Sequence, residues 1–195
     1  MNIARLVCGA ILSSAVSLAA HGAPVTFTES VTGSGSLGSA FSSQLITISG
    51  TADTSGITTG VGLYTLFLPT ATITVNGFSP VTLNGGVTVF SNTFAQVAGF
   101  EAHSPTFDVL DTVSPAFAAY MLVGAISSSG TAQFLAGTAF ATSGGSFVLD
   151  SVSGNSTFTA GAPTSGIAPE PASIALFGTG LLAFAGTTRR KICRA

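Results

Sequence analysis

The fold is decided by Gln44-Leu-Ile-Thr-Ile-Ser49 and Ala71-Thr-Ile-Thr-Val-Asn76, in which apolar residues alternate with threonine or serine. A period of two places the apolar side chains on one face of an extended strand and the hydroxyls on the other. The same alternation recurs at 81–83, 87–90, 106–110, 146–149 and 156–159. The pattern predicts an all-β fold built from short, half-buried strands.

Turn residues separate these runs. Asn76-Gly77 and Asn84-Gly85 lie between strands, and Asn-Gly favours the positive φ angles of a type I′ turn, so both predict β-hairpins. Glycine and serine clusters at 33–39, 127–130 and 143–145 predict further turns, whereas 115–125 could form a helix or a strand. We therefore expect residues 23–160 to form one antiparallel β-sandwich, jelly-roll-like, of roughly eight to eleven strands.

Charged residues are scarce in this chain. Five Lys or Arg and seven Asp or Glu make up 6% of 195 residues, against about a quarter in ordinary globular proteins. The hydrophobic fraction of 46% is too high for a disordered chain. The basic residues all lie near a terminus, which leaves no basic face for phosphates and excludes nucleic-acid binding: Arg5, Arg189, Arg190, Lys191 and Arg194.

The N-terminus has the layout of a secretory signal peptide. Arg5 precedes an apolar stretch at 6–20, and the small-residue run Ala20-His21-Gly22-Ala23 follows. We expect residues 1–22 to be removed by signal peptidase between Gly22 and Ala23. A permanent membrane helix is the alternative, but a run of about 15 residues is short for a membrane span.

The C-terminus carries a second apolar segment. Seventeen uncharged residues at 172–188 lie between Pro169-Glu170-Pro171 and Arg189-Arg190-Lys191. They predict a transmembrane helix whose basic end stays in the cytoplasm, so the residues before Pro169 lie outside the inner membrane. Residues 161–168 are then a linker to this tail.

The tail resembles a known family of sorting signals. Pro169, Glu170, Pro171, the apolar helix and the arginine pair match the PEP-CTERM signal of exported proteins in Gram-negative bacteria that make extracellular polysaccharide. A segment of this kind is also named after ice-binding proteins that carry it. The resemblance implies that residues 169–195 are recognised by the membrane protease exosortase, which cuts near the motif. A plain membrane anchor without processing is the alternative.

Candidate site residues lie in one acidic stretch. Glu101, Asp108 and Asp111 could offer carboxylate oxygens to Ca²⁺, although no EF-hand loop is present and a solvated acidic loop is the simpler interpretation. His103 lies near Ser104, Asp108 and Asp111, which formally permits a Ser-His-Asp site. No cationic residue lies between 23 and 168 to support an oxyanion, so we expect no catalytic site and no cofactor.

These observations predict a non-enzymatic protein that is secreted or attached to the cell surface. Its expected role is as a component of the extracellular matrix or biofilm, associated with exopolysaccharide or with other copies of itself. An ice-binding or adhesive surface is an alternative suggested by the alternating threonines, although the sequence lacks a regular repeat. A secreted hydrolase that uses His103 is a further alternative.

Overall fold

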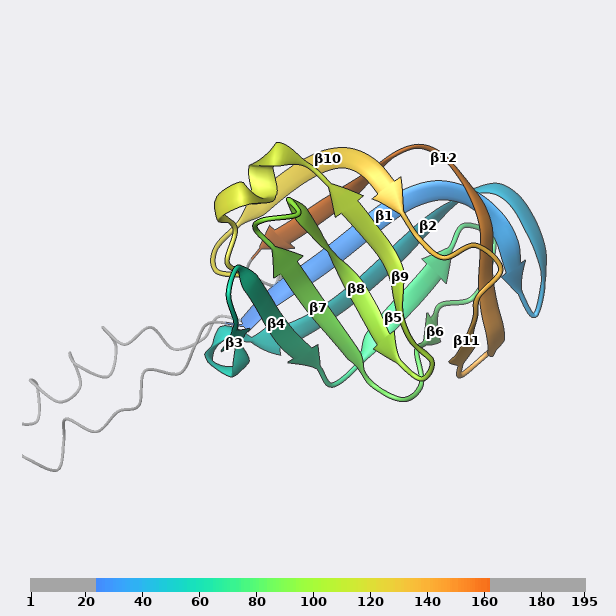
Figure 1. Cartoon of the computed structure of the whole chain (residues 1–195). Coiled ribbons are helices and arrows are strands. Elements are labelled where there is room, and N and C mark those ends of the chain that lie inside the picture. Colours follow the sequence, from blue (N-terminus) through green and yellow to red (C-terminus); the bar gives the residue numbers. More distant parts are fainter. Residues whose placement is uncertain (1–23, 162–195) are drawn as a thin grey trace, which may run out of the picture. The chain divides into compact units, whose positions relative to one another are not determined.

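Twelve antiparallel strands and two short 3-10 helices make up residues 24–161, the part of the chain that the computed structural model describes (Figure 1). The first six strands are β1 (Pro24–Leu37), β2 (Ser39–Asp53), β3 (Thr58–Thr59), β4 (Leu63–Leu68), β5 (Ala71–Val75) and β6 (Val81–Thr82). The remaining strands are β7 (Val87–Asn92), β8 (Val97–His103), β9 (Thr106–Val113), β10 (Ile126–Gln133), β11 (Ala139–Thr142) and β12 (Gly145–Gly161). The 3-10 helices are η1 (Thr54–Gly56) and η2 (Pro115–Ala119).

The strands form one continuous sheet that curls on itself. Their order is β3-β4-β7-β8-β9-β10-β12-β1-β2-β5-β6, and β11 pairs with β12 off this path. The half that contains β7, β8 and β9 faces the half that contains β1 and β2 (Figure 1). A side-chain hydrogen bond of 2.7 Å from Thr112 of β9 to Glu29 of β1 joins the two halves.

The prediction of an antiparallel all-β fold is confirmed. The two layers of the expected sandwich are parts of a single curled sheet, which has one strand more than the expected upper limit. The predicted signal helix and the transmembrane helix at 172–188 lie outside the described residues. Within residues 24–161, no helix has the length and apolarity needed to cross a membrane.

Phenylalanine dominates the core. The largest fully buried side chains include six phenylalanines: Phe27, Phe100, Phe117, Phe140, Phe147 and Phe158. Phe158 is central, because the rings of Phe27, Phe100, Phe117 and Tyr120 all lie 5.6 to 6.3 Å from its ring. Each such burial contributes about 1.5–3 kcal/mol to stability. Residues 24–161 contain no cysteine, so this apolar burial takes the place of disulfides.

The two Asn-Gly predictions had different outcomes. Asn76-Gly77 joins β5 to β6 in a hairpin, but only Gly77 has a positive φ (86°), so the turn is not type I′. The hairpin predicted at Asn84-Gly85 is wrong. The Asn84-Gly85 segment connects β6 to β7, and these strands are not neighbours. β6 is the last strand on one side of the sheet, and β7 lies near the other side.

Two of the three predicted glycine–serine turns are strands instead. The cluster at 33–39 lies mostly within β1, with the turn confined to Gly38, and 127–130 lies within β10. Glycine allows neighbouring strands to approach closely at these sites. For example, a Cβ on Gly130 would collide with the carbonyl oxygen of Val113. The third cluster, at 143–145, does turn the chain from β11 into β12. The ambiguous segment 115–125 begins with η2, which is capped by the side chain of Ser114.

Candidate functional site

Serine and threonine side chains line the outer surface of five adjacent strands. Strand pairing places them in two rows that run across β5, β2, β1, β12 and β10. The first row is Thr72, Ser49, Thr28, Thr159 and Ser127, and the second is Thr74, Thr47, Ser30, Thr157 and Ser129. We call these ten residues the hydroxyl face. Their alternate neighbours along the strands, such as Phe27, Ile48 and Phe158, are buried in the core.

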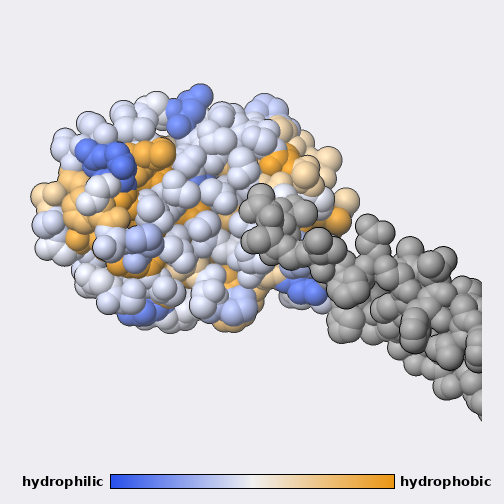
Figure 2. Space-filling view, turned by 180° about the vertical axis from the view of Figure 1, so that it is seen from behind, coloured by the Kyte–Doolittle hydropathy of each residue, from blue (hydrophilic) through white to orange (hydrophobic). Residues whose placement is uncertain are grey.

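The hydroxyl face is regular and uncharged. Adjacent strands lie about 4.8 Å apart and alternate residues repeat at about 6.8 Å along a strand, which sets the spacing of the hydroxyls. Each hydroxyl can both donate and accept a hydrogen bond. Ser129 and Thr157 are joined by a 2.7 Å hydrogen bond between their hydroxyls. Figure 2 shows the domain from behind, where residues of weak hydropathy cover most of the surface.

The sequence predicted the hydroxyls but not their rows. Alternation places threonine and serine on one side of each strand, yet it does not say which strands are neighbours. β1 lies between β2 and β12, and β12 follows it by more than a hundred residues in the chain. A regular array therefore arises here without a regular repeat in the sequence.

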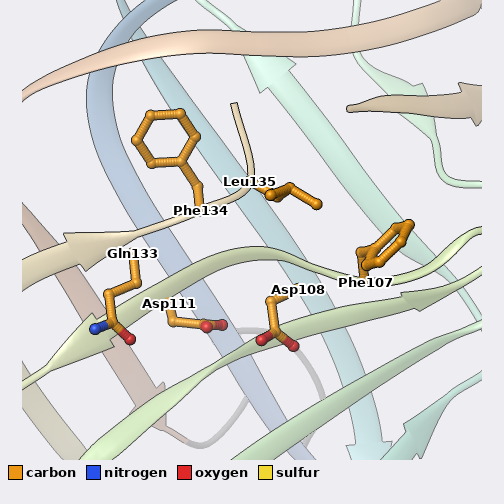
Figure 3. A pocket seen from close by; sticks show the side chains of 6 residues that line it. All are labelled: Phe107, Asp108, Asp111, Gln133, Phe134 and Leu135. Carbon is orange, nitrogen blue, oxygen red and sulfur yellow. The ribbon is translucent and has the colours of Figure 1, made fainter. Parts of the chain in front are cut away.

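A second feature is a groove of about 260 Å³ on the other half of the sheet (Figure 3). It is lined by Phe107, Asp108, Asp111, Gln133, Phe134 and Leu135. β10 pairs with β9 only at the end of β9, where Gln133 lies opposite Asp111. The chain then leaves the sheet at 134–138, so the first half of β9 is open on this side. We call this feature the acidic groove.

Asp111 is the most strongly perturbed group in the groove. Asp111 is only 4% exposed, and its Oδ1 atom has no hydrogen-bond partner. The carboxyl packs over Gly99 of β8, where any Cβ would collide with it. Burial, followed by the nearby carboxyl groups of Asp108 and Glu101, raises the pKa of Asp111 to about 9. Asp111 is therefore protonated at neutral pH.

The three residues considered for Ca²⁺ come together, but they do not form a metal site. Glu101 and Asp108 are cross-strand neighbours on β8 and β9, and Asp111 follows on β9. Burial also raises the pKa of Asp108. Among residues 24–161, no three His, Cys, Asp or Glu side chains are grouped so as to hold a metal ion.

His103 is engaged elsewhere. Its Nε2 atom lies 2.7 Å from the hydroxyl of Thr88, and its ring lies 5.9 Å from that of Phe67. Within the described part of the chain, no hydrogen bond links His103 to Ser104, Asp108 or Asp111. The Ser-His-Asp arrangement that the sequence formally permitted is not assembled.

A buried network of polar groups joins β1, β9 and β12 inside the core. The hydroxyl of Thr112 lies 2.7 Å from both Glu29 Oε1 and the hydroxyl of Ser156, which donates to the carbonyl oxygen of Asp111. Glu29 is fully buried, and burial, followed by electrostatic interaction with the Asp111 carboxyl, raises its pKa well above the ordinary value. These groups are closed to solvent, so the network is structural. Alternation does carry a signal for Glu29, because this residue shares the face of β1 that carries the buried Phe27 and Val31.

Comparison with protein families identifies the tail. The model of the PEP-CTERM protein-sorting motif matches residues 168–191. The chain carries a PEP-CTERM sorting signal. This signal directs an exported protein to exosortase, and the matched stretch includes all six predicted sorting residues: Pro169, Glu170, Pro171, Arg189, Arg190 and Lys191. These residues lie outside the part that the structure describes. No curated protein and no solved structure matches the chain.

Proposed function

We propose that this PEP-CTERM protein is a non-enzymatic component of the extracellular matrix that binds exopolysaccharide through its hydroxyl face. The observation that carries the proposal is the pair of uncharged hydroxyl rows across five strands. A neutral polysaccharide presents many hydroxyls that donate and accept hydrogen bonds, as serine and threonine do. The sorting signal supports a destination outside the cell, where such polymers are found.

The shape of the surface favours a flexible polymer. Adjacent strands rotate by roughly 20–25° relative to one another, so five strands form a twisted surface rather than a plane. A polysaccharide chain can follow this twist, whereas a crystal plane matches it only locally. The absence of Lys and Arg from residues 24–161 also disfavours strongly acidic ligands.

The proposed route begins at the N-terminus. Signal peptidase cleaves between Gly22 and Ala23, and the helix at 172–188 holds the precursor in the inner membrane of a Gram-negative cell. Exosortase then recognises Pro169-Glu170-Pro171 and transfers the protein to the cell surface or the medium.

Binding of the exported protein to exopolysaccharide purified from the same host tests the proposal. In the test variant, Thr28, Thr47, Thr157 and Thr159 are replaced by Val, which keeps the β-branched shape and removes the hydroxyl. A matched control carries Thr58→Val, Thr59→Val and Thr65→Val on β3 and β4. We expect the test variant to lose binding and the control to keep it. Equal binding by wild type and both variants would refute a role for the hydroxyl face.

Ice binding is a second candidate, and the regular spacing of the same two rows supports it. A crystal lattice requires repeated spacing, which the cross-strand register supplies. Thermal hysteresis of the exported protein tests this candidate. Hysteresis that disappears in the test variant would establish ice binding, and its absence in wild type would exclude it.

A further inference from the structure

Both ends of the described chain leave the domain at the same end. Thr26, near the start of β1, pairs with Gly161, the last residue of β12, so the two chain ends are neighbours. The loop before β4 and the turn from β7 to β8 also lie at this end (Figure 1), and the Thr93 amide of one donates to the Gly62 carbonyl of the other. The segment after η2 reaches the same end (Figure 1).

Four large apolar side chains are exposed in these loops. Val61 is 89% exposed, Phe94 75%, Val123 64% and Met121 50%. We call them the apolar end. Leu122 is fully buried with a positive φ of 62°, and the residues on either side of it are exposed to solvent. Clustered exposed apolar residues commonly mark a contact surface.

The sequence beyond this end indicates what covers it. Seven residues lie between Gly161 and Pro169, so the connecting chain reaches at most about 28 Å. The expected membrane segment at 172–188 follows directly. A domain tethered so closely to a bilayer keeps the end from which the tether leaves near the membrane surface.

We propose that the apolar end rests on the lipid surface of the inner membrane while the protein is an anchored precursor. The inference rests on the proposed membrane anchor. Residues 24–161 contain no Lys or Arg, so the contact is apolar insertion at the headgroup boundary rather than attraction to anionic lipid.

The tether makes this weak contact effective. A small apolar contact binds membranes poorly by itself, but tethering converts it into an intramolecular event at high effective concentration. The contact holds the Pro169 motif at the membrane face, where a membrane protease acts. Once the tail is cut, the apolar end alone does not retain the domain, which then detaches.

Fluorescence quenching in vesicles tests the proposal. The precursor without its signal peptide, residues 23–195 with Cys193→Ser, is reconstituted into phosphatidylcholine vesicles with and without nitroxide-labelled phospholipid. A fluorophore is attached at Ala95→Cys, beside Phe94, or at Ser39→Cys, the first residue of β2 at the opposite end. Flotation of the vesicles independently reports insertion of the tail.

We expect the precursor to float and nitroxide lipid to quench the probe at position 95 but not at 39. A variant with Val61→Ser, Phe94→Ser, Met121→Ser and Val123→Ser should lose the quenching without a change in flotation. Flotation without quenching at position 95 would overturn the lipid contact and leave the anchor intact. Failure to float would overturn both.

Other occupants would give a different result. A second copy or another segment of the chain on the apolar end would shield the probe at position 95 from aqueous iodide without quenching by nitroxide lipid. That result would also overturn the proposal.

Discussion

The domain should be most stable in mild acid and lose stability as the pH rises through neutrality. Asp111 is neutral in the folded protein, where burial and neighbouring carboxyls raise its pKa to about 9. In the unfolded chain an aspartate titrates near 3.9. Between these values the folded state binds more protons than the unfolded state, so the free energy of unfolding decreases with pH.

The magnitude follows from the two pKa values. One such group lowers the free energy of unfolding by about 1.4 kcal/mol per pH unit, or about 4 kcal/mol between pH 4 and pH 7. The contribution is fully present below the unfolded pKa and is gone above the folded one. Glu29 acts in the same direction, because its pKa is also raised by burial.

Urea denaturation between pH 4.5 and pH 8.5 measures this effect in wild type, Asp111→Asn and the exposed control Asp150→Asn. The amide of Asp111→Asn cannot ionise, so this variant should be more stable than wild type at pH 8 and show a shallower pH dependence. Asp150→Asn should follow wild type. A wild-type stability that rises from pH 5 to pH 8, or an Asp111→Asn slope equal to that of wild type, would refute the reasoning.

Three further predictions concern processing and packing. The exported form should begin within about three residues of Ala23, and mass spectrometry that finds Met1 would contradict this. Replacing Pro169-Glu170-Pro171 with Ala should trap the protein as an inner-membrane precursor, whereas release at wild-type levels would favour a plain anchor. Gly99→Ala should lower the free energy of unfolding by about 1–3 kcal/mol, because the new methyl group collides with the Asp111 carboxyl, and unchanged urea denaturation would contradict that contact.

Local periodicity predicted the strands well. The alternating runs at 44–49, 71–76, 87–90 and 106–110 fall in β2, β5, β7 and β9, because each has enough apolar residues on one face to require burial. The runs at 146–149 and 156–159 belong to one strand, β12, because the intervening residues pair with β1 despite their polarity. Whether two runs belong to one strand depends on the residues with which they pair, and the sequence of a single run does not reveal those partners.

The site was harder to predict for the same reason. Asn84-Gly85 has the local chemistry of a hairpin, but its flanking strands pair with distant partners. The hydroxyl face depends on β12 joining β1, a contact between the two ends of the domain. The acidic residues stand out as a group in the sequence, yet the burial that protonates Asp111 depends on Gly99 and on where β10 leaves the sheet. The sorting motif was the easiest feature, because its parts are contiguous.

Polysaccharide bound to the hydroxyl face would lie against the threonines of β1, β2 and β12. Amide and methyl chemical-shift perturbation of the isotope-labelled, exported protein, titrated with oligosaccharides cut from the host's exopolysaccharide, tests this contact most directly. We predict that the perturbed signals map to Thr28, Thr47, Thr157, Thr159 and their neighbours on β1, β2 and β12. Perturbations confined to the acidic groove, or no perturbation at saturating oligosaccharide, would contradict binding at the hydroxyl face.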